Sequence, residues 1–230
     1  FFFRRMGILF ALGLLNLCLW WADILHVYAL AGLALLLFRR ASNGVVLTSA
    51  VVFGFGFTWA HFAFSKYVFP LEFDPALAQA HYPALLSTDF GTMAEANYRI
   101  QRLFQTTGLV VYMYGHAIGC ILFGYWLFRK DLFGRLEQYV RMIKQVWWIG
   151  LAFIAVPWAF VYAGKAGLME NPWFYHGAFP LFQGAIFGMS LFYSTSIILL
   201  YRRGLFKRVF GAFAQVGRMS LTNYLVQSIL

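Results

Sequence analysis

The chain has little charge and none of the short motifs that mark common water-soluble enzymes. Only 11% of its 230 residues are charged, whereas 62% are hydrophobic, and a soluble domain could not bury that much apolar surface. The sequence contains no nucleophile elbow, P-loop, dinucleotide fingerprint or zinc motif. These absences argue against the familiar soluble catalytic classes and favour an integral membrane protein.

Cysteine is also scarce. Cys18 and Cys120 both lie within apolar runs, where a thiol packs as a small hydrophobic side chain. This placement argues against a disulfide and against a metal-binding pair, so we expect no metal site.

The sequence contains long runs of apolar residues. A helix needs roughly 20 apolar residues to cross a bilayer, and the two-residue alternation of membrane strands is missing. We therefore predict an all-α fold, a polytopic transmembrane bundle of about seven helices that forms one domain over residues 1–230. The runs cover residues 6–22, 24–38, 45–64, 103–128, 146–163 and 179–200, and a seventh starts near Met219.

Both ends of the chain look cut. The sequence has no initiator Met, and the run from Met219 stops at Leu230, before it could cross a bilayer. We expect an internal part of a longer membrane protein, truncated at both ends.

The basic residues predict an orientation. Most of the 18 Lys and Arg residues, among them Arg39, Arg129 and Arg202, lie in alternate loops between the runs. The positive-inside rule places these loops in the cytoplasm and Asp23 on the external side. Because the charges form small clusters at helix ends, we expect the partner to be anionic lipid headgroups and not nucleic acid.

The longest segment outside the apolar runs, about residues 65–102, is expected to be external. Thr92 and Glu95 have the spacing of a capping box, which predicts a helix from near Met93 to Phe128. Pro157 predicts a kink in the fifth run. Small residues four apart allow helices to approach closely, as in the pairs Gly115/Gly119 and Gly184/Gly188.

Three runs contain polar side chains at helical spacing. Polar groups at membrane depth face protein or a cavity, so we expect them to converge on the bundle interior, where they either join helices or line a substrate cavity. The three sets are Gln105, Tyr112 and His116; Gln183, Ser190 and Ser194; and Ser220, Asn223 and Gln227. His116, near a helix midpoint, is either a packing residue or a catalytic or proton-relay group.

Asp23 separates the first two apolar runs and should occupy the corner of a tight helical hairpin. There it would cap the second helix. The alternative is functional: with His26, one turn further on, it would form an acid/base pair at the outer mouth of the bundle.

Two stretches resemble a known family. They are ADILHVYA, residues 22–29, which follows Arg4, Arg5 and Asn16, and GRMSLTNYLVQS, residues 217–228. Both are similar to signatures of the YeiB-like family of bacterial inner-membrane proteins, a domain of unknown function, although Ala22 stands where that family usually has Gly. The resemblance implies a multi-pass protein of the bacterial inner membrane.

The YeiB-like layout is in turn distantly similar to membrane acyltransferases of the heparan N-acetyltransferase type. That similarity implies transfer of an acyl group from cytoplasmic acyl-CoA to an envelope sugar or lipid. Asp23 and His26 would then act on the acceptor, and Arg218 would bind a CoA phosphate. The substrate-binding residues would be Tyr28, Asn223, Tyr224 and Gln227. The alternatives are a transporter, with His116 relaying protons, and a non-catalytic membrane scaffold whose contact faces are the glycine pairs.

Overall fold

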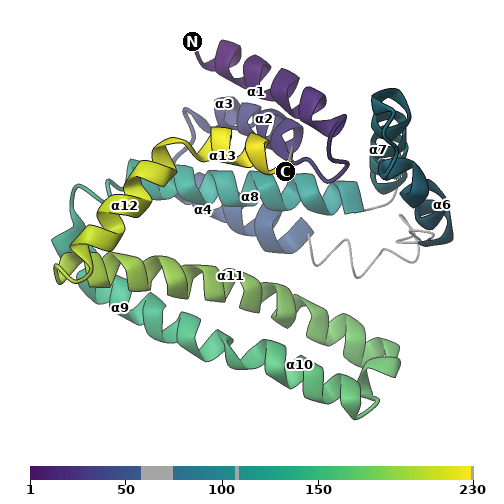
Figure 1. The fold of residues 1–230 in the computed structure, drawn as a ribbon. Coiled ribbons are helices and arrows are strands. Elements are labelled where there is room, and N and C mark those ends of the chain that lie inside the picture. The colour runs from purple at the N-terminus through teal and green to yellow at the C-terminus, as the bar shows by residue number, and fades with distance from the viewer. Residues whose placement is uncertain (58–74, 107–108, 229–230) are drawn as a thin grey trace. The chain divides into compact units, whose positions relative to one another are not determined.

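The computed structural model describes residues 1–57, 75–106 and 109–228, and these residues are helical with short turns (Figure 1). The chain divides into two compact units. One comprises Phe1–Leu127 together with Leu221–Leu230, and the other comprises Phe128–Ser220. The all-α class is therefore confirmed for the described residues.

The first unit is built around a short helix, α2, which packs on two others. Its Val27 and Ala31 are buried against Ala117 of α8, and α1 contacts it along a second face. α8 packs in turn on α4, where Val46, Ala50 and Leu122 form a second cluster. The helices of this unit are α1 (Phe2–Leu17), α2 (Leu25–Leu33), α3 (Leu35–Phe38), α4 (Asn43–Val51), η1 (Val52–Gly56), α6 (Pro75–Leu85), α7 (Phe90–Thr106), α8 (Leu109–Arg129) and α13 (Ser220–Gln227).

The predicted long helix from Met93 to Phe128 is helical on both sides of residues 107–108, and its continuity across them stays a prediction. The structure has two helices there, α7 and α8, and residues 107–108 between them lie outside the described residues. The predicted capping box is wrong. Asp89 precedes the helix and accepts hydrogen bonds from the amide and the hydroxyl of Thr92, both at 2.7 Å, while Glu95 binds Arg99. An Asp three residues earlier thus provides the cap and starts the helix sooner.

The second unit contains a long antiparallel hairpin, α9 and α10 against α11 (Figure 1). A Cβ on Gly150 of α9 would lie 2.7 Å from the carbonyl oxygen of Gly188 in α11, so the two backbones approach closely, as small residues permit. The helices are α9 (Leu136–Phe153), α10 (Ala155–Lys165), η2 (Leu168–Glu170), α11 (Pro172–Arg202) and α12 (Lys207–Arg218).

Pro157 has the effect that the sequence predicts. The helix is interrupted at Ile154, between α9 and α10. A proline has no amide hydrogen, and its ring clashes with the carbonyl four residues earlier, which here belongs to Phe153. The hairpin then turns through Gly167, whose φ of 73° is one that glycine adopts without strain.

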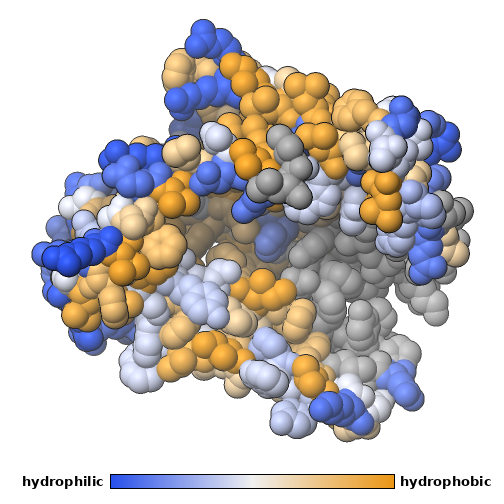
Figure 2. All heavy atoms as spheres, in the orientation of Figure 1, coloured by the Kyte–Doolittle hydropathy of each residue, from blue (hydrophilic) through white to orange (hydrophobic). Residues whose placement is uncertain are grey.

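Two helical segments are long and apolar enough to cross a membrane, Leu136–Lys165 and Gly184–Arg202. The core helix of a soluble protein would be mostly buried, but only 6% and 17% of their most apolar windows are buried here. Hydrophobic side chains also cover parts of the surface along α1 and along the α9–α11 hairpin (orange in Figure 2). The two segments indicate membrane association, and the full polytopic bundle of about seven helices stays a prediction.

α12 is the most amphipathic helix of the second unit. Val209, Phe213 and Val216 recur at spacings of four and three residues and are exposed, so they form an apolar stripe along one side. Lys207 and Arg218 lie on the opposite side of the helix. This is the pattern of a helix that lies at a membrane surface.

Candidate functional site

Asp23 lies in the turn between α1 and α2 and is almost completely buried, at 1% exposed. One carboxylate oxygen, Oδ1, accepts hydrogen bonds from Asn16 Nδ2 at 2.9 Å and from the Tyr224 hydroxyl at 3.2 Å. The other, Oδ2, accepts from the Leu25 amide at 3.0 Å and lies 3.1 Å from His26 Nδ1. Each oxygen therefore has two partners, as a buried carboxylate requires.

These contacts decide the charge of Asp23. Burial opposes ionisation, but the hydrogen bonds from His26, Asn16 and Tyr224 outweigh it and hold the pKa of the Asp23 carboxyl below its usual value of 3.8. Asp23 is therefore an anion at neutral pH.

His26 is 4% exposed and both of its ring nitrogens have partners. Because Asp23 is an acceptor, the neutral ring has its proton on Nδ1. Nε2 is then an acceptor and lies 3.4 Å from the amide nitrogen of Gln101. That distance is long for a hydrogen bond, so Gln101 binds Nε2 weakly.

α7 also contacts the turn between α1 and α2 through Asn97, which lies four residues before Gln101. Asn97 Oδ1 accepts a hydrogen bond from the Trp21 amide at 2.8 Å, and its Nδ2 donates to the carbonyl oxygen of Cys18 at 3.1 Å. Asn97 thus satisfies backbone groups of the turn that no helix satisfies, and it fixes α7 beside His26.

α13 contributes Tyr224 from the far end of the chain. The Tyr224 hydroxyl donates to Asp23 and also lies 3.4 Å from the Ile24 amide, and its ring is 6.4 Å from that of Trp20. One turn therefore gathers polar side chains from α1, α2, α7 and α13. We call Asn16, Asp23, His26, Asn97, Gln101 and Tyr224 the Asp23 cluster.

The corner itself is wider than the tight hairpin that the sequence predicts, because α1 ends at Leu17 and α2 begins only at Leu25. The helices still approach closely at Gly13. A Cβ there would lie 2.5 Å from the His26 amide nitrogen and 3.1 Å from Asp23 Oδ2. A residue without a side chain is needed for α1 to pass the cluster at this distance.

The arrangement supports two chemical roles. Asp23 satisfies the amide of Leu25, the first residue of α2, although the N-cap position that the sequence assigns to it is occupied by Ile24. Asp23 also orients the His26 ring and stabilises a positive charge on it, which is how a carboxylate prepares a histidine for general base catalysis.

The predicted substrate- and cofactor-binding residues lie on different helices and differ in exposure. Tyr28 is exposed on α2, and Gln227 is exposed on α13. Asn223 is half-buried on α13, and Arg218 is exposed at the end of α12. Of the predicted substrate-binding residues, the structure brings Tyr224 to Asp23 and His26.

His116 belongs to α8 and is not a member of the Asp23 cluster. It is half-buried, and its Nε2 lies 3.6 Å from Cys120 Sγ, one turn further along the helix. Among the described residues no group of three His, Cys, Asp or Glu side chains is placed to hold a metal ion.

The polar set on α11 differs from the expectation that it faces the bundle interior. Ser190 and Ser194 are exposed, and each hydroxyl donates to the carbonyl oxygen four residues earlier, at 3.0 and 2.8 Å. Such bonds satisfy a serine within its own helix, so these two residues need no partner helix.

Three amide residues of the cluster are absent from the candidates that the sequence suggests. Asn97 and Gln101 are four residues apart on a helix, which places both on one face. Asn16 is a lone amide in an apolar run, seven residues before Asp23. A polar residue within an apolar helix is the signal that could identify Asn16, whereas α7 has many polar residues and gives no such signal for Asn97 and Gln101.

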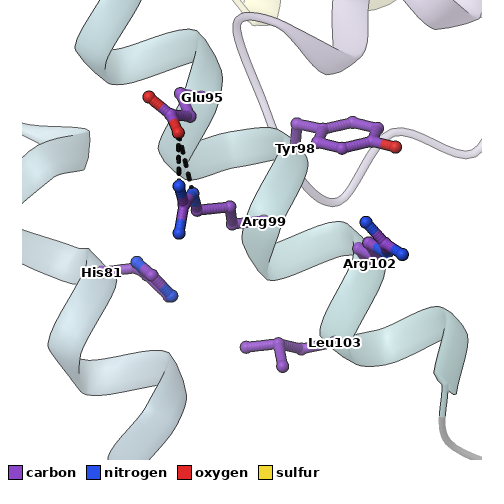
Figure 3. A pocket seen from close by; sticks show the side chains of 6 residues that line it. All are labelled: His81, Glu95, Tyr98, Arg99, Arg102 and Leu103. Carbon is purple, nitrogen blue, oxygen red and sulfur yellow. Dashed lines mark hydrogen bonds and ion pairs between the residues drawn. The ribbon is translucent and has the colours of Figure 1, made fainter.

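A surface hollow lies elsewhere in the first unit, between α6 and α7 (Figure 3). His81 faces it from α6, and Arg102 and Leu103 line it from α7. Arg99 is held by Glu95 through contacts of 2.6 and 3.0 Å, which neutralise its charge. Both partners are well exposed, where an ion pair contributes little to stability, and we assign no function to this hollow.

Comparison with known proteins finds two similarities, one over nearly the whole chain and one over its C-terminal part. Overall, the chain is 30% identical to the uncharacterized protein YxaH of Bacillus subtilis (strain 168), in an alignment that covers 99% of this chain and 57% of YxaH. No solved structure matches the chain. Residues 127–230 match the family model of a protein of unknown function, DUF418. This segment of the chain is therefore similar to the DUF418 family, an uncharacterised family as the YeiB-like signatures suggest.

Proposed function

We propose that the protein is a multi-pass acyltransferase of the bacterial inner membrane that acylates a sugar or lipid of the cell envelope. The observation that carries this proposal is the Asp23–His26 pair, with Oδ2 and Nδ1 3.1 Å apart. A carboxylate that holds one imidazole nitrogen leaves the other to accept a proton from a hydroxyl group.

In the proposed reaction the thioester of acyl-CoA enters the bundle from the cytoplasmic side and reaches His26, where the hydroxyl oxygen of the external acceptor attacks the acyl carbonyl carbon. The hydroxyl proton passes to His26 Nε2, and the bond between the acyl group and the CoA sulfur breaks. The acceptor hydroxyl takes the place of the Gln101 amide, whose 3.4 Å contact with Nε2 is weak. Tyr224 and Asn16 keep Asp23 ionised while the ring becomes positive.

The remaining candidate residues act on the two substrates. Arg218, exposed at the end of α12, binds a phosphate of acyl-CoA, the acyl donor. Tyr28, Asn223 and Gln227 contact the acceptor or the acyl chain. The chain spans 57% of the length of YxaH, so the activity is proposed for the full-length protein.

The proposed orientation follows the charges. Asp23 is external, and Arg39, Arg129 and Arg202 are cytoplasmic, where anionic lipids attract basic residues. The amphipathic pattern of α12 supports this arrangement, because its apolar stripe and its cations suit an interface with anionic headgroups.

Acyl transfer in membrane vesicles tests the proposal. Inside-out vesicles that contain the full-length protein would receive radiolabelled acetyl-CoA, and label in membrane lipids and glycans would be measured. We expect His26→Gln to lower the transfer rate about 100-fold or more, which is the usual contribution of a general base.

The matched control is His81→Gln, the same substitution at a half-buried histidine outside the cluster, which should transfer at nearly the wild-type rate. Circular dichroism would verify that the variants are folded. Wild-type transfer by His26→Gln would contradict the proposal. Unchanged transfer by Arg218→Ala and Asn223→Ala would remove those two assignments.

Burial favours a second candidate, a proton-coupled transporter. Asp23 and His26 are 1% and 4% exposed, and buried titratable pairs bind the coupled proton in many transporters. In that case vesicles would accumulate an envelope precursor only under a pH gradient, Asp23→Asn would abolish the accumulation, and no acetyl label would be transferred.

A further inference from the structure

The hairpin of the second unit has a hollow of about 460 Å³ that is separate from the Asp23 cluster. Lys144 and Trp148 line it from α9, and Leu199 and Leu200 line it from α11, with Arg203 directly after that helix. All of these residues belong to one compact unit. The hollow lies near the basic end of the two candidate membrane spans.

The charge of the hollow is positive. Glu137, the acidic residue at this end of α9, forms two hydrogen bonds of 2.8 Å with the guanidinium group of Arg202. Across residues 1–57, 75–106 and 109–228, none of the ion pairs includes Lys144 or Arg203. Two cations at one hollow, with the nearby carboxylate already bound, attract an anion.

The walls of the hollow are apolar and firmly held. Trp147 Nε1 donates to Ser196 Oγ at 2.7 Å and its ring lies 5.2 Å from that of Phe192, so α9 and α11 are joined here. The Trp148 ring packs edge-on against Trp147 and is 65% exposed. An exposed indole beside leucines suits an alkyl chain at the boundary between lipid tails and headgroups.

We propose that this hollow binds the phosphate group of an anionic amphiphile between Lys144 and Arg203, with the acyl chain along Trp148 and Leu199. Two ligands share this chemistry, an anionic phospholipid and a long-chain acyl-CoA. A basic pocket between helices at a cytoplasmic face is a recurrent phospholipid site. The acyl-CoA alternative rests on the proposed acyltransferase function, whereas the phospholipid alternative does not.

Native mass spectrometry of the delipidated, full-length protein tests the site. The ligands are dioleoyl phosphatidylglycerol, dioleoyl phosphatidylcholine with the same chains but no net charge, palmitoyl-CoA, and CoA without an acyl chain. The wild-type protein should bind one or both acyl-chain anions roughly tenfold or more tightly than phosphatidylcholine. Lys144→Gln with Arg203→Gln should weaken that binding about 10- to 30-fold, since each cation contributes to anion binding.

The matched control removes one arginine and one lysine elsewhere on the basic side, Arg129→Gln with Lys130→Gln, and should bind as the wild type does. The exchanged pair Lys144→Arg with Arg203→Lys keeps both charges and should also retain binding. Loss confined to phosphatidylglycerol identifies a phospholipid site, and loss confined to palmitoyl-CoA identifies a donor site. Equal binding of phosphatidylcholine, or no difference between the double variant and its control, would overturn the inference.

This binding assay does not depend on turnover. His26→Gln should leave binding at Lys144 and Arg203 unchanged even if it abolishes acyl transfer. A protein that binds the amphiphile without any transferase activity would contradict the proposed function alone.

Discussion

At the scale of single residues, the most constrained group is the Asp23 carboxylate. It is buried among four hydrogen-bond partners from α1, α2 and α13. A buried charge without such partners would be strongly destabilising. The hydrogen bonds to Asp23 therefore stabilise the fold more when the carboxylate is ionised than when it is protonated.

The pH dependence of stability follows from the lowered pKa of Asp23. Because this pKa is below 3.8 in the folded protein, the carboxylate stabilises the fold fully above pH 3.8, and the contribution disappears as pH falls through the folded-state pKa. Asp23→Asn should be about 1–3 kcal/mol less stable than wild type at pH 7. The difference should be constant down to about pH 5 and shrink below about pH 4.

Thermal unfolding in detergent between about pH 7 and pH 3 measures that difference. Glu170→Gln is a suitable control because the Glu170 carboxylate is at the protein surface and outside the Asp23 cluster. A gap between wild type and Asp23→Asn that stays constant to the acid end of this range would show that ionisation of Asp23 does not stabilise the fold.

The sequence suggests three of the six residues of this cluster, Asp23, His26 and Tyr224, but only one of the contacts among them. Asp23 and His26 are three residues apart at the start of a helix, so their contact follows from helical geometry. Asn97, Gln101 and Tyr224 reach the same turn from 75 to 201 residues away. Their approach depends on how α7 and α13 pack on the corner, and no local pattern encodes such packing.

At the scale of helices, small residues decide where two backbones meet. In α1 the critical position is Gly13, which faces the backbone of His26, whereas a Cβ added to Gly7 of the same helix would meet no atom within 4 Å. The two glycines thus form a natural pair of test and control.

Gly13→Ala should destabilise the protein by about 1–3 kcal/mol, since the added methyl group must move α1 away from α2. The same shift would disturb the contacts of Asp23 Oδ2, so acyl transfer should fall as well. Gly7→Ala should be neutral or stabilising by up to about 1 kcal/mol, because alanine favours a helix over glycine. Equal stability of the two variants in thermal unfolding would disprove the close contact at Gly13.

Helix boundaries are only partly predictable from the sequence, for a physical reason. The break near Pro157 is confirmed because a proline acts on its own helix whatever surrounds it. The predicted start of α7 is wrong because Asp89 and Thr92 are both good caps, and the sequence does not say which of them the chain uses. The hydrogen bonds from Thr92 to Asp89 settle that choice.

At the scale of the whole molecule, the distribution of charge is more informative than its total. The net charge of +10 would suit many anionic partners. The arrangement in small clusters at the ends of apolar segments is the basis of the proposal that the basic residues meet headgroups on one side of a bilayer. Few residues in the apolar windows of the two candidate spans are buried, which is consistent with contact to lipid.

Cysteine labelling tests the orientation that these charges predict. In full-length protein with Cys18→Ala and Cys120→Ala, a single cysteine would replace Ser87, in the segment predicted to be external, or Lys130, in a basic cluster predicted to be cytoplasmic. Both positions precede or follow a helix and are accessible enough to label. A maleimide that cannot cross membranes should modify Ser87→Cys in intact cells and Lys130→Cys only after the membrane is permeabilised, because the positive-inside rule keeps the basic loops in the cytoplasm. The reverse pattern would place Asp23 and His26 on the cytoplasmic side of the membrane, the same side as the acyl donor. Labelling of both cysteines in intact cells would contradict a membrane-spanning segment between positions 87 and 130.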